Sequence, residues 1–123
     1  MIWSKFLAVI WMVSIAVISY LSLTPKIEFP LDFKKADLVY HFMAYLWLSA
    51  LPFFSFPQEK TAFVSASLML PLGIGLELAQ IAVPGRVFSS MDVGANSVGV
   101  ILGLFCARFL RSSLSVRSKG LTR

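Results

Sequence analysis

The sequence predicts an all-α fold: a polytopic membrane protein whose transmembrane helices form a four-helix bundle. Hydrophobic residues make up 58% of the 123 residues and the mean hydropathy is +0.81, whereas soluble domains are about 45–50% apolar. Residues 6–23 contain no charge, which is long enough for a helix that crosses a bilayer. Most of the chain lies in such apolar stretches, so a soluble core is excluded.

The four helices are expected at residues 3–23, 37–56, 61–83 and 92–110. The first ends before Pro25, because the residue before a proline disfavours the helical conformation. A signal peptide is the alternative for this segment, but the apolar stretch is longer than the usual h-region and no A-x-A-like site follows it. The second helix begins near Asp37, an acid at the positive end of the helix dipole. Pro52 and Pro57 are expected to kink and then end it.

The third and fourth helices are interrupted by glycine and proline. Segment 71–75, PLGIG, permits a local break just before Glu77, because neighbouring helices can satisfy the freed backbone groups. Residues 84–86, Pro-Gly-Arg, turn the chain into the fourth helix. There, the spacing of Gly99 and Gly103 lets a neighbouring helix approach closely, which favours packing and leaves a homo-oligomer contact open.

Four crossings place both ends of the chain on one side of the membrane. Seven of the eleven basic residues fall on that side: Lys5, Lys60, Arg108, Arg111, Arg117, Lys119 and Arg123. The positive-inside rule therefore predicts cytoplasmic termini, with residues 1–111 as one transmembrane domain and residues 112–123 as a basic, flexible cytoplasmic tail. The net charge of +5 is explained by this flank and does not indicate binding to nucleic acid.

Seven polar residues are expected near one membrane face: Asp37, His41, Glu77, Gln80, Arg86, Asp92 and Asn96. Two lie at the start of the second helix, two near the end of the third, one in the next loop and two at the start of the fourth. Short loops in an up-down bundle bring these ends together. Polar side chains at membrane depth are costly and rare unless they pair, line a cavity or act on something.

These residue types permit several chemistries. Asp37 and His41 within hydrogen-bond reach would form a general base, and a partly buried Glu77 would serve as an acid. Arg86 would bind a phosphate or carboxylate in bidentate fashion, with ligand contacts from Gln80, Asp92 and Asn96. The carboxylates and the imidazole suit a divalent cation equally well, so the need for a metal or another cofactor is open. The lone Cys106 excludes an intramolecular disulfide.

Six short motifs occur in order along residues 22–103: Ser22-Leu23-Thr24-Pro25, Asp37-x-x-x-His41-Phe42-x-x-Tyr45, Glu77-x-x-Gln80, Pro84-Gly85-Arg86, Asp92-x-x-x-Asn96 and Val98-Gly99. The set resembles the VanZ-like membrane proteins, although Leu38 stands where that family often has lysine. The resemblance implies a bacterial cytoplasmic (inner) membrane and a cell-envelope setting, since the namesake is associated with resistance to the glycopeptide teicoplanin. It does not supply a reaction.

Three hypotheses follow for the function. The first is a membrane protein that binds or modifies an envelope component, lipid-linked or phosphate-bearing, and whether it is an enzyme stays open. The second is a structural or partner-binding module, in which Arg86 pairs with the acids of the third and fourth helices and only fixes the register of the helices. The third is a transport or ion-binding role, suggested by the glycines and proline near Glu77, which would require an oligomer.

Overall fold

The computed structural model describes residues 2–25 and 36–121, and the regular structure in both segments is helical. The elements are α1 (Ile2–Leu23), α2 (Ala36–Ala50), α3 (Pro52–Ser55), α4 (Glu59–Ala79), the 3₁₀ turn η1 (Gln80–Ala82) and α5 (Ser90–Leu121). Four spans are long and apolar enough to cross a membrane: Ile2–Leu23, Asp37–Ser55, Glu59–Ala82 and Ser90–Leu121. The predicted all-α fold with four transmembrane helices is therefore confirmed.

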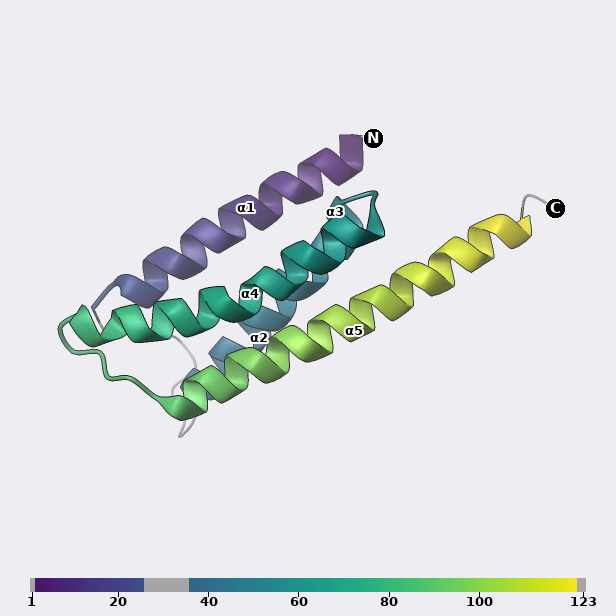
Figure 1. Cartoon of the computed structure of the whole chain (residues 1–123). Helices are drawn as coiled ribbons and strands as arrows, with labels where there is room; N and C mark the ends of the chain where they lie inside the picture. The colour runs from purple at the N-terminus through teal and green to yellow at the C-terminus, as the bar shows by residue number, and fades with distance from the viewer. Residues whose placement is uncertain (1, 26–35, 122–123) are drawn as a thin grey trace.

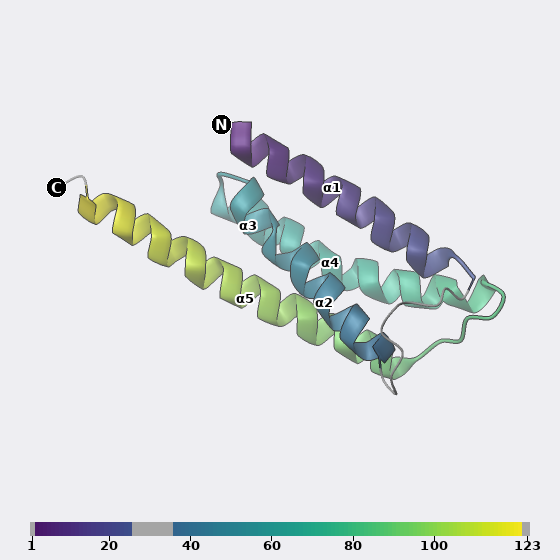
Figure 2. The same cartoon turned by 180° about the vertical axis from the view of Figure 1, so that it is seen from behind.

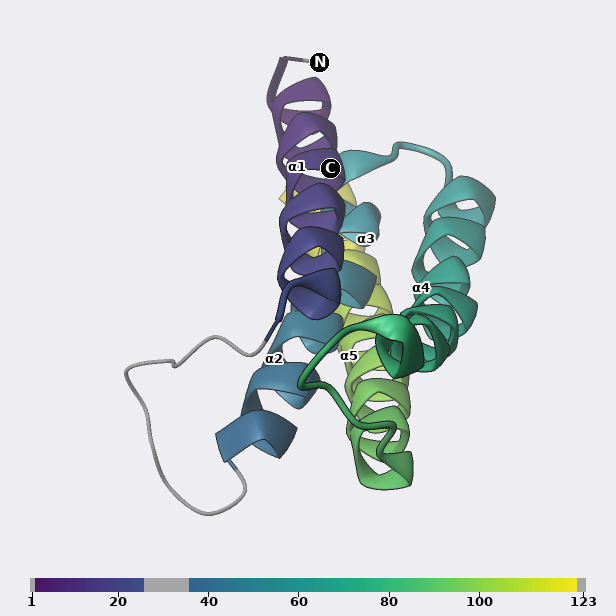
Figure 3. The same ribbon diagram turned by 90° about the vertical axis from the view of Figure 1, so that its left-hand side faces the viewer.

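The helices lie along one bundle, and one end of it collects four helix termini (Figures 1 and 2). The last turns of α1 and α4 and the first turns of α2 and α5 meet there. Figure 3, in which this end faces the viewer, shows the loop after η1 running across the bundle toward α1. At the opposite end, α5 extends beyond the other helices (Figure 1). All seven polar candidates lie on elements that meet at the first end.

The boundaries differ from the expected ones mainly at prolines and at the end of the chain. A one-residue turn at Leu51 separates α2 from α3, which begins at Pro52, a position where the missing N–H costs little. Pro71 lies inside a continuous α4, so the permitted break before Glu77 is not formed. Helix α5 continues through residues 112–121, where a flexible tail was expected. Residues 26–35, between the first two expected helices, and Arg123 lie outside the described residues.

Helices α2 and α5 run in the same direction and touch through their backbones. A Cβ atom added to Gly99 would lie 2.5 Å from the carbonyl oxygen of Phe42 and 3.1 Å from the nitrogen of Leu46. One turn later, Gly103 lies directly against Leu46 and the Ser49 hydroxyl. The Ser49 hydroxyl also donates hydrogen bonds to the carbonyls of Leu46, at 3.2 Å, and Gly99, at 3.4 Å. The close approach that the two glycines permit is thus made within the chain.

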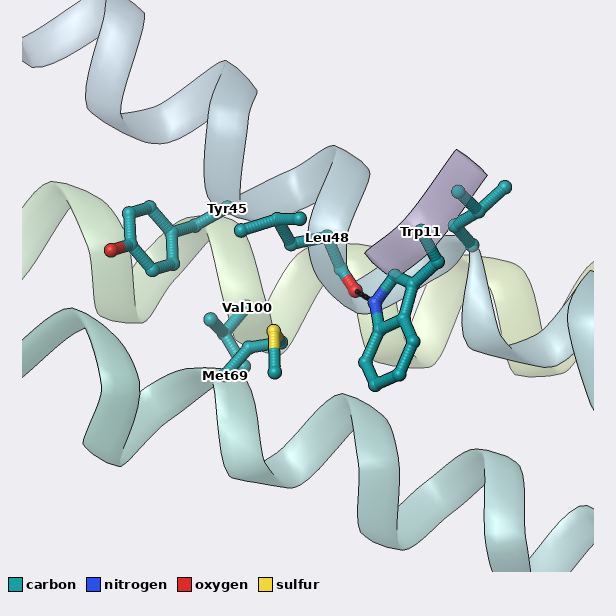
Figure 4. Packing of buried hydrophobic residues seen from close by; sticks show 6 residues of the cluster. Trp11, Tyr45, Leu48, Met69 and Val100 are labelled. Carbon is teal, nitrogen blue, oxygen red and sulfur yellow. Dashed lines mark hydrogen bonds between the residues drawn. The ribbon is translucent and has the colours of Figure 1, made fainter. Parts of the chain in front are cut away.

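Trp11 is the one buried side chain that α1 contributes to the core among the described residues. It belongs to one buried cluster with Tyr45, Leu48, Met69 and Val100 (Figure 4). Its indole N–H donates a hydrogen bond of 2.8 Å to the carbonyl of Leu48. In a continuous helix this carbonyl would accept from the residue four positions later, which is proline 52 and has no N–H. The indole therefore satisfies a buried acceptor that the proline leaves open.

The other end of α1 is held by side chains from the far half of the sequence. Arg86 donates from Nη2 to the carbonyl of Leu21 and from Nε to that of Thr24, both at 3.0 Å. Gln80 Nε2 donates to the carbonyl of Ser22 at 2.9 Å. The last four carbonyls of a helix have no partner within it, and a positive charge is favoured beside them. Arg86 and Gln80 together cap α1 and join it to the bundle.

The backbone contact at Gly99 predicts a difference between two glycines on α5. Gly99→Ala should lower the free energy of unfolding by about 1–3 kcal/mol, the usual cost of overpacking, because α2 must move away. Gly94→Ala is the matched control, since a Cβ there has nothing within 4 Å, and it should raise stability by about 0.5–1 kcal/mol. Thermal unfolding in detergent micelles measures both. Equal midpoints for Gly99→Ala and the unmodified protein would contradict this packing.

The capping of α1 predicts that Arg86 matters more for stability than an arginine in an exposed ion pair. Arg86→Met should cost about 1–3 kcal/mol, because helix-end carbonyls lose charged donors, and should speed hydrogen exchange in the last turns of α1. Arg108→Met removes a pair with Glu59 whose side chains are about half exposed, so it should cost less than about 1 kcal/mol. Amide exchange followed by mass spectrometry separates the two; a larger effect of Arg108→Met would refute the cap.

Candidate ligand-binding site

A cavity of about 210 Å³ opens at the end of the bundle where α1 ends and α2 begins. Five of the seven predicted site residues line it: Asp37, His41, Gln80, Arg86 and Asp92. The rest of its lining is largely apolar or aromatic and includes Ile18, Leu21, Ala44 and Tyr45. The other two predicted residues are buried next to His41, with Glu77 1% and Asn96 4% exposed. The structure thus brings residues from all four spans into one place.

His41 is oriented by a hydrogen bond between helices. Its Nδ1 lies 2.9 Å from Oδ1 of Asn96 on α5, so Nδ1 carries a proton and donates it. The second nitrogen, Nε2, faces Oδ2 of Asp92 at 3.6 Å, which is longer than a normal hydrogen bond. The neutral ring therefore presents the lone pair of Nε2 toward Asp92, and a protonated ring would form an ion pair with it.

Ser89 positions the two acids Glu77 and Asp92, although it was not among the predicted residues. Its hydroxyl accepts the N–H of Asp92 at 3.3 Å, which makes it the N-cap of α5. In a full capping box the acid three residues later would accept the backbone N–H of the cap. Here Oε1 of Glu77 takes that N–H at 2.9 Å, so the carboxylate of Asp92 turns to His41 instead. The S-x-x-D pattern at residues 89–92 was the available sequence signal.

Gly73 on α4 provides the space that these contacts need. A Cβ atom there would lie 2.9 Å from the ring of Tyr45 and 3.3 Å from Nδ2 of Asn96. The tyrosine is 2% exposed and belongs to the core. Because Gly73 has no side chain, Tyr45 and Asn96 both lie against α4, and Asn96 reaches His41 from there.

The pairing inside the site differs from the pairs considered from the sequence. The acid beside the histidine is Asp92 from α5, whereas Asp37, one turn before His41, is an exposed residue at the cavity wall. Arg86 donates to carbonyls of α1, and the ion pairs among the described residues are His41–Asp92 and Arg108–Glu59. Within the described part of the chain, Glu77 and Asp92 therefore form no ion pair with a lysine or arginine.

The buried polar atoms of the site also have hydrogen-bond partners. Every buried side-chain nitrogen and oxygen in the described residues has a partner. The His41 ring, the amide of Asn96 and the carboxyl group of Glu77 are consequently oriented before any ligand binds. One imidazole and two carboxylates, Glu77 and Asp92, bring ligand atoms within 4.8 Å of one another. Such a group can exchange protons or hold a cation.

Comparison with known proteins agrees with the motifs. The model of the VanZ/LLP1 family matches residues 4–111, which include all four spans up to residue 111 and all seven predicted site residues. Neither the curated proteins nor the solved structures contain a match to the chain. With four helices that can cross a membrane, and with the family's model matched over most of its length, the chain is a multi-pass membrane protein that belongs to the VanZ/LLP1 family.

Proposed function

We propose that this protein binds the headgroup of an envelope component, lipid-linked or phosphate-bearing, in the cavity at the end of the bundle. In this proposal it resides in the bacterial inner membrane with both termini in the cytoplasm, so the cavity faces the extracytoplasmic side. It would act in cell-envelope processes, with glycopeptide (teicoplanin) resistance as one setting. The observation that carries the proposal is the mixed lining of the cavity, which combines charged and amide side chains with apolar ones.

The lining suits an amphiphile. Charged and amide groups from α2, η1, the following loop and α5 contribute to its lining, and Ile18, Leu21 and Ala44 of α1 and α2 supply apolar surface. The volume of about 210 Å³ is smaller than the roughly 300–1,000 Å³ of pockets that enclose a whole drug-sized ligand. A headgroup fits such a space, and an attached hydrocarbon chain would remain in the bilayer.

Two groups supply the chemistry for a bound headgroup. Arg86 places a permanent positive charge at the cavity wall, and guanidinium groups recognise phosphate and carboxylate. His41 and Asp92 lie 3.6 Å apart, and such distances shorten when a substrate is bound. The pair can therefore move a proton to or from the ligand, which connects binding to modification of the ligand.

A second candidate function is a structural module whose polar cluster fixes the register of the helices. The hydrogen bonds from Arg86 and Gln80 to α1 and the bond between His41 and Asn96 support it, since they join elements far apart in sequence. In this case substitutions in the cluster would lower the stability of the protein, and neither the unmodified protein nor the variants would bind a ligand.

Binding of a simple amphiphilic anion separates the two functions. In maltoside micelles, dodecyl phosphate should raise the unfolding midpoint of the protein, because a ligand at a hundred times its Kd stabilises by about 2.7 kcal/mol. His41→Ala should abolish the shift. Glu59→Gln is the control, since Glu59 lies at the opposite end of α4, and it should respond like the unmodified protein. A shift retained in His41→Ala would contradict the proposed site.

The same hypothesis can be tested in a bacterium that lacks the gene. A variant with His41→Ala and Glu77→Ala, expressed at the normal level, should fail to restore the envelope phenotype. Full restoration would leave the cluster without a functional role.

A further inference from the structure

We infer that His41, Glu77 and Asp92 form a binding site for one divalent transition-metal ion. The three residues come from α2, α4 and α5, and one ligand atom of each lies within 4.8 Å of the others. They are a histidine and two carboxylates, all partly or fully buried. An ion held by them would join three of the four membrane spans at the wall of the cavity.

The spacing of the ligand atoms fits an ion better than it fits direct contact. Nε2 of His41 and Oδ2 of Asp92 are 3.6 Å apart, too far for a normal hydrogen bond. Two ligands bound to tetrahedral zinc at about 2.1 Å lie about 3.4 Å from each other. The ligand atom of Glu77 lies within 4.8 Å of the other two, so an ion bound by all three would draw this carboxylate closer to them.

The ligands are supported in the way that metal ligands usually are. The nitrogen of a coordinating histidine that does not bind the metal typically donates to an oxygen, which fixes the ring. Nδ1 of His41 donates to Oδ1 of Asn96 at 2.9 Å, so Nε2 is left as the coordinating atom. Glu77 is held by the N–H of Ser89 through Oε1. This single bond uses one of the roughly four acceptor positions of a carboxylate.

The charges give an independent reason for a cation. Glu77 is 1% exposed, and a buried carboxylate is costly unless a charge or several donors compensate it. Among the described residues, neither Glu77 nor Asp92 pairs with a lysine or arginine, and Arg86 donates to the carbonyls of α1. The charge of Arg86 acts on both carboxyl groups without a direct ion pair, and one histidine can offset one negative charge at most, whereas a divalent ion bound between the acids would offset two.

The ligand set favours a transition metal. Imidazole suits zinc and similar ions, while magnesium and calcium prefer sites made of oxygen ligands alone. Three protein ligands leave a coordination position open, as in catalytic zinc sites, and His41 and Asp92 direct that position toward the cavity they line. An ion there would attract the negative oxygen of a headgroup. This last link depends on the function proposed above, but metal binding itself does not.

The test is a titration of the purified full chain in maltoside micelles after treatment with EDTA. Calorimetry with ZnCl2 and elemental analysis should give one zinc per chain, and MgCl2 or CaCl2 should bind at least about tenfold more weakly. Glu77→Gln, which keeps the bond from Ser89, and His41→Ala should each weaken zinc binding by roughly 100-fold or more. Glu59→Gln should bind as the unmodified protein does. Should Glu77→Gln fail to fold, Asp92→Asn gives the same comparison.

Asn96 supplies a test that a purely structural role would not pass. Asn96→Leu should weaken zinc binding about 10–100-fold, the usual effect of losing a supporting partner. Asn96→Asp keeps the acceptor for Nδ1 and should retain the affinity. No stoichiometric zinc in the unmodified protein, or equal affinity in Glu77→Gln, would overturn the inference.

A repeat of the dodecyl phosphate titration with and without zinc separates this inference from the proposed function. Zinc should tighten phosphate binding at least about tenfold. Zinc binding without any phosphate binding would refute the headgroup function and leave the metal site standing. Phosphate binding in a protein that takes up no zinc would refute the metal site and leave the function standing.

Discussion

The backbone contact between α2 and α5 sets the geometry on which the site depends. Gly99 allows α5 to touch the carbonyl of Phe42, and His41 and Asn96 lie one residue and three residues earlier on the two helices. Because the helices run in the same direction, this contact places the imidazole level with the amide, and the 2.9 Å hydrogen bond follows. Gly73 then lets Tyr45 and Asn96 lie against α4. Two glycine positions thus fix how three helices present their polar side chains.

The ends of the helices supply the remaining order. The loop after η1 brings Arg86 to the last carbonyls of α1, and Ser89 at its far end caps α5. Glu77 accepts the N–H of that cap, which leaves the carboxylate of Asp92 available to His41. A short loop therefore does three things at once: it attaches α1, starts α5 and positions two acids. A polar site at this place is a consequence of how the helix ends are satisfied.

The sequence was sufficient for the spans and for the meeting of the seven polar residues, because hydropathy and loop length determine both. It did not determine which acid faces the histidine. Asp37 and Asp92 each begin a helix, and the register between α2 and α5 decides which of them faces His41. This register is set by the contact at Gly99, and the spacing of residues along the sequence does not give it. The bond from Trp11 to the Leu48 carbonyl was hidden for a related reason. The Leu48 carbonyl lacks its helical donor because Pro52 has no N–H. The sequence does not show which distant side chain will donate to this carbonyl instead.

The same residues would serve to fix the helices and to bind a ligand. The positions of these residues therefore do not distinguish the two functions, whereas the charge balance of the cluster does. A cluster that only joined helices would need its charges balanced within itself. In the described residues the one guanidinium beside the site is directed to the carbonyls of α1, while the buried Glu77 and the partly buried Asp92 face one imidazole. The bundle would be equally well joined if Glu77 were a glutamine, since that side chain could also accept the N–H of Ser89. The carboxyl group at that position is therefore the feature that packing leaves unexplained and that a bound cation or a transferred proton would require.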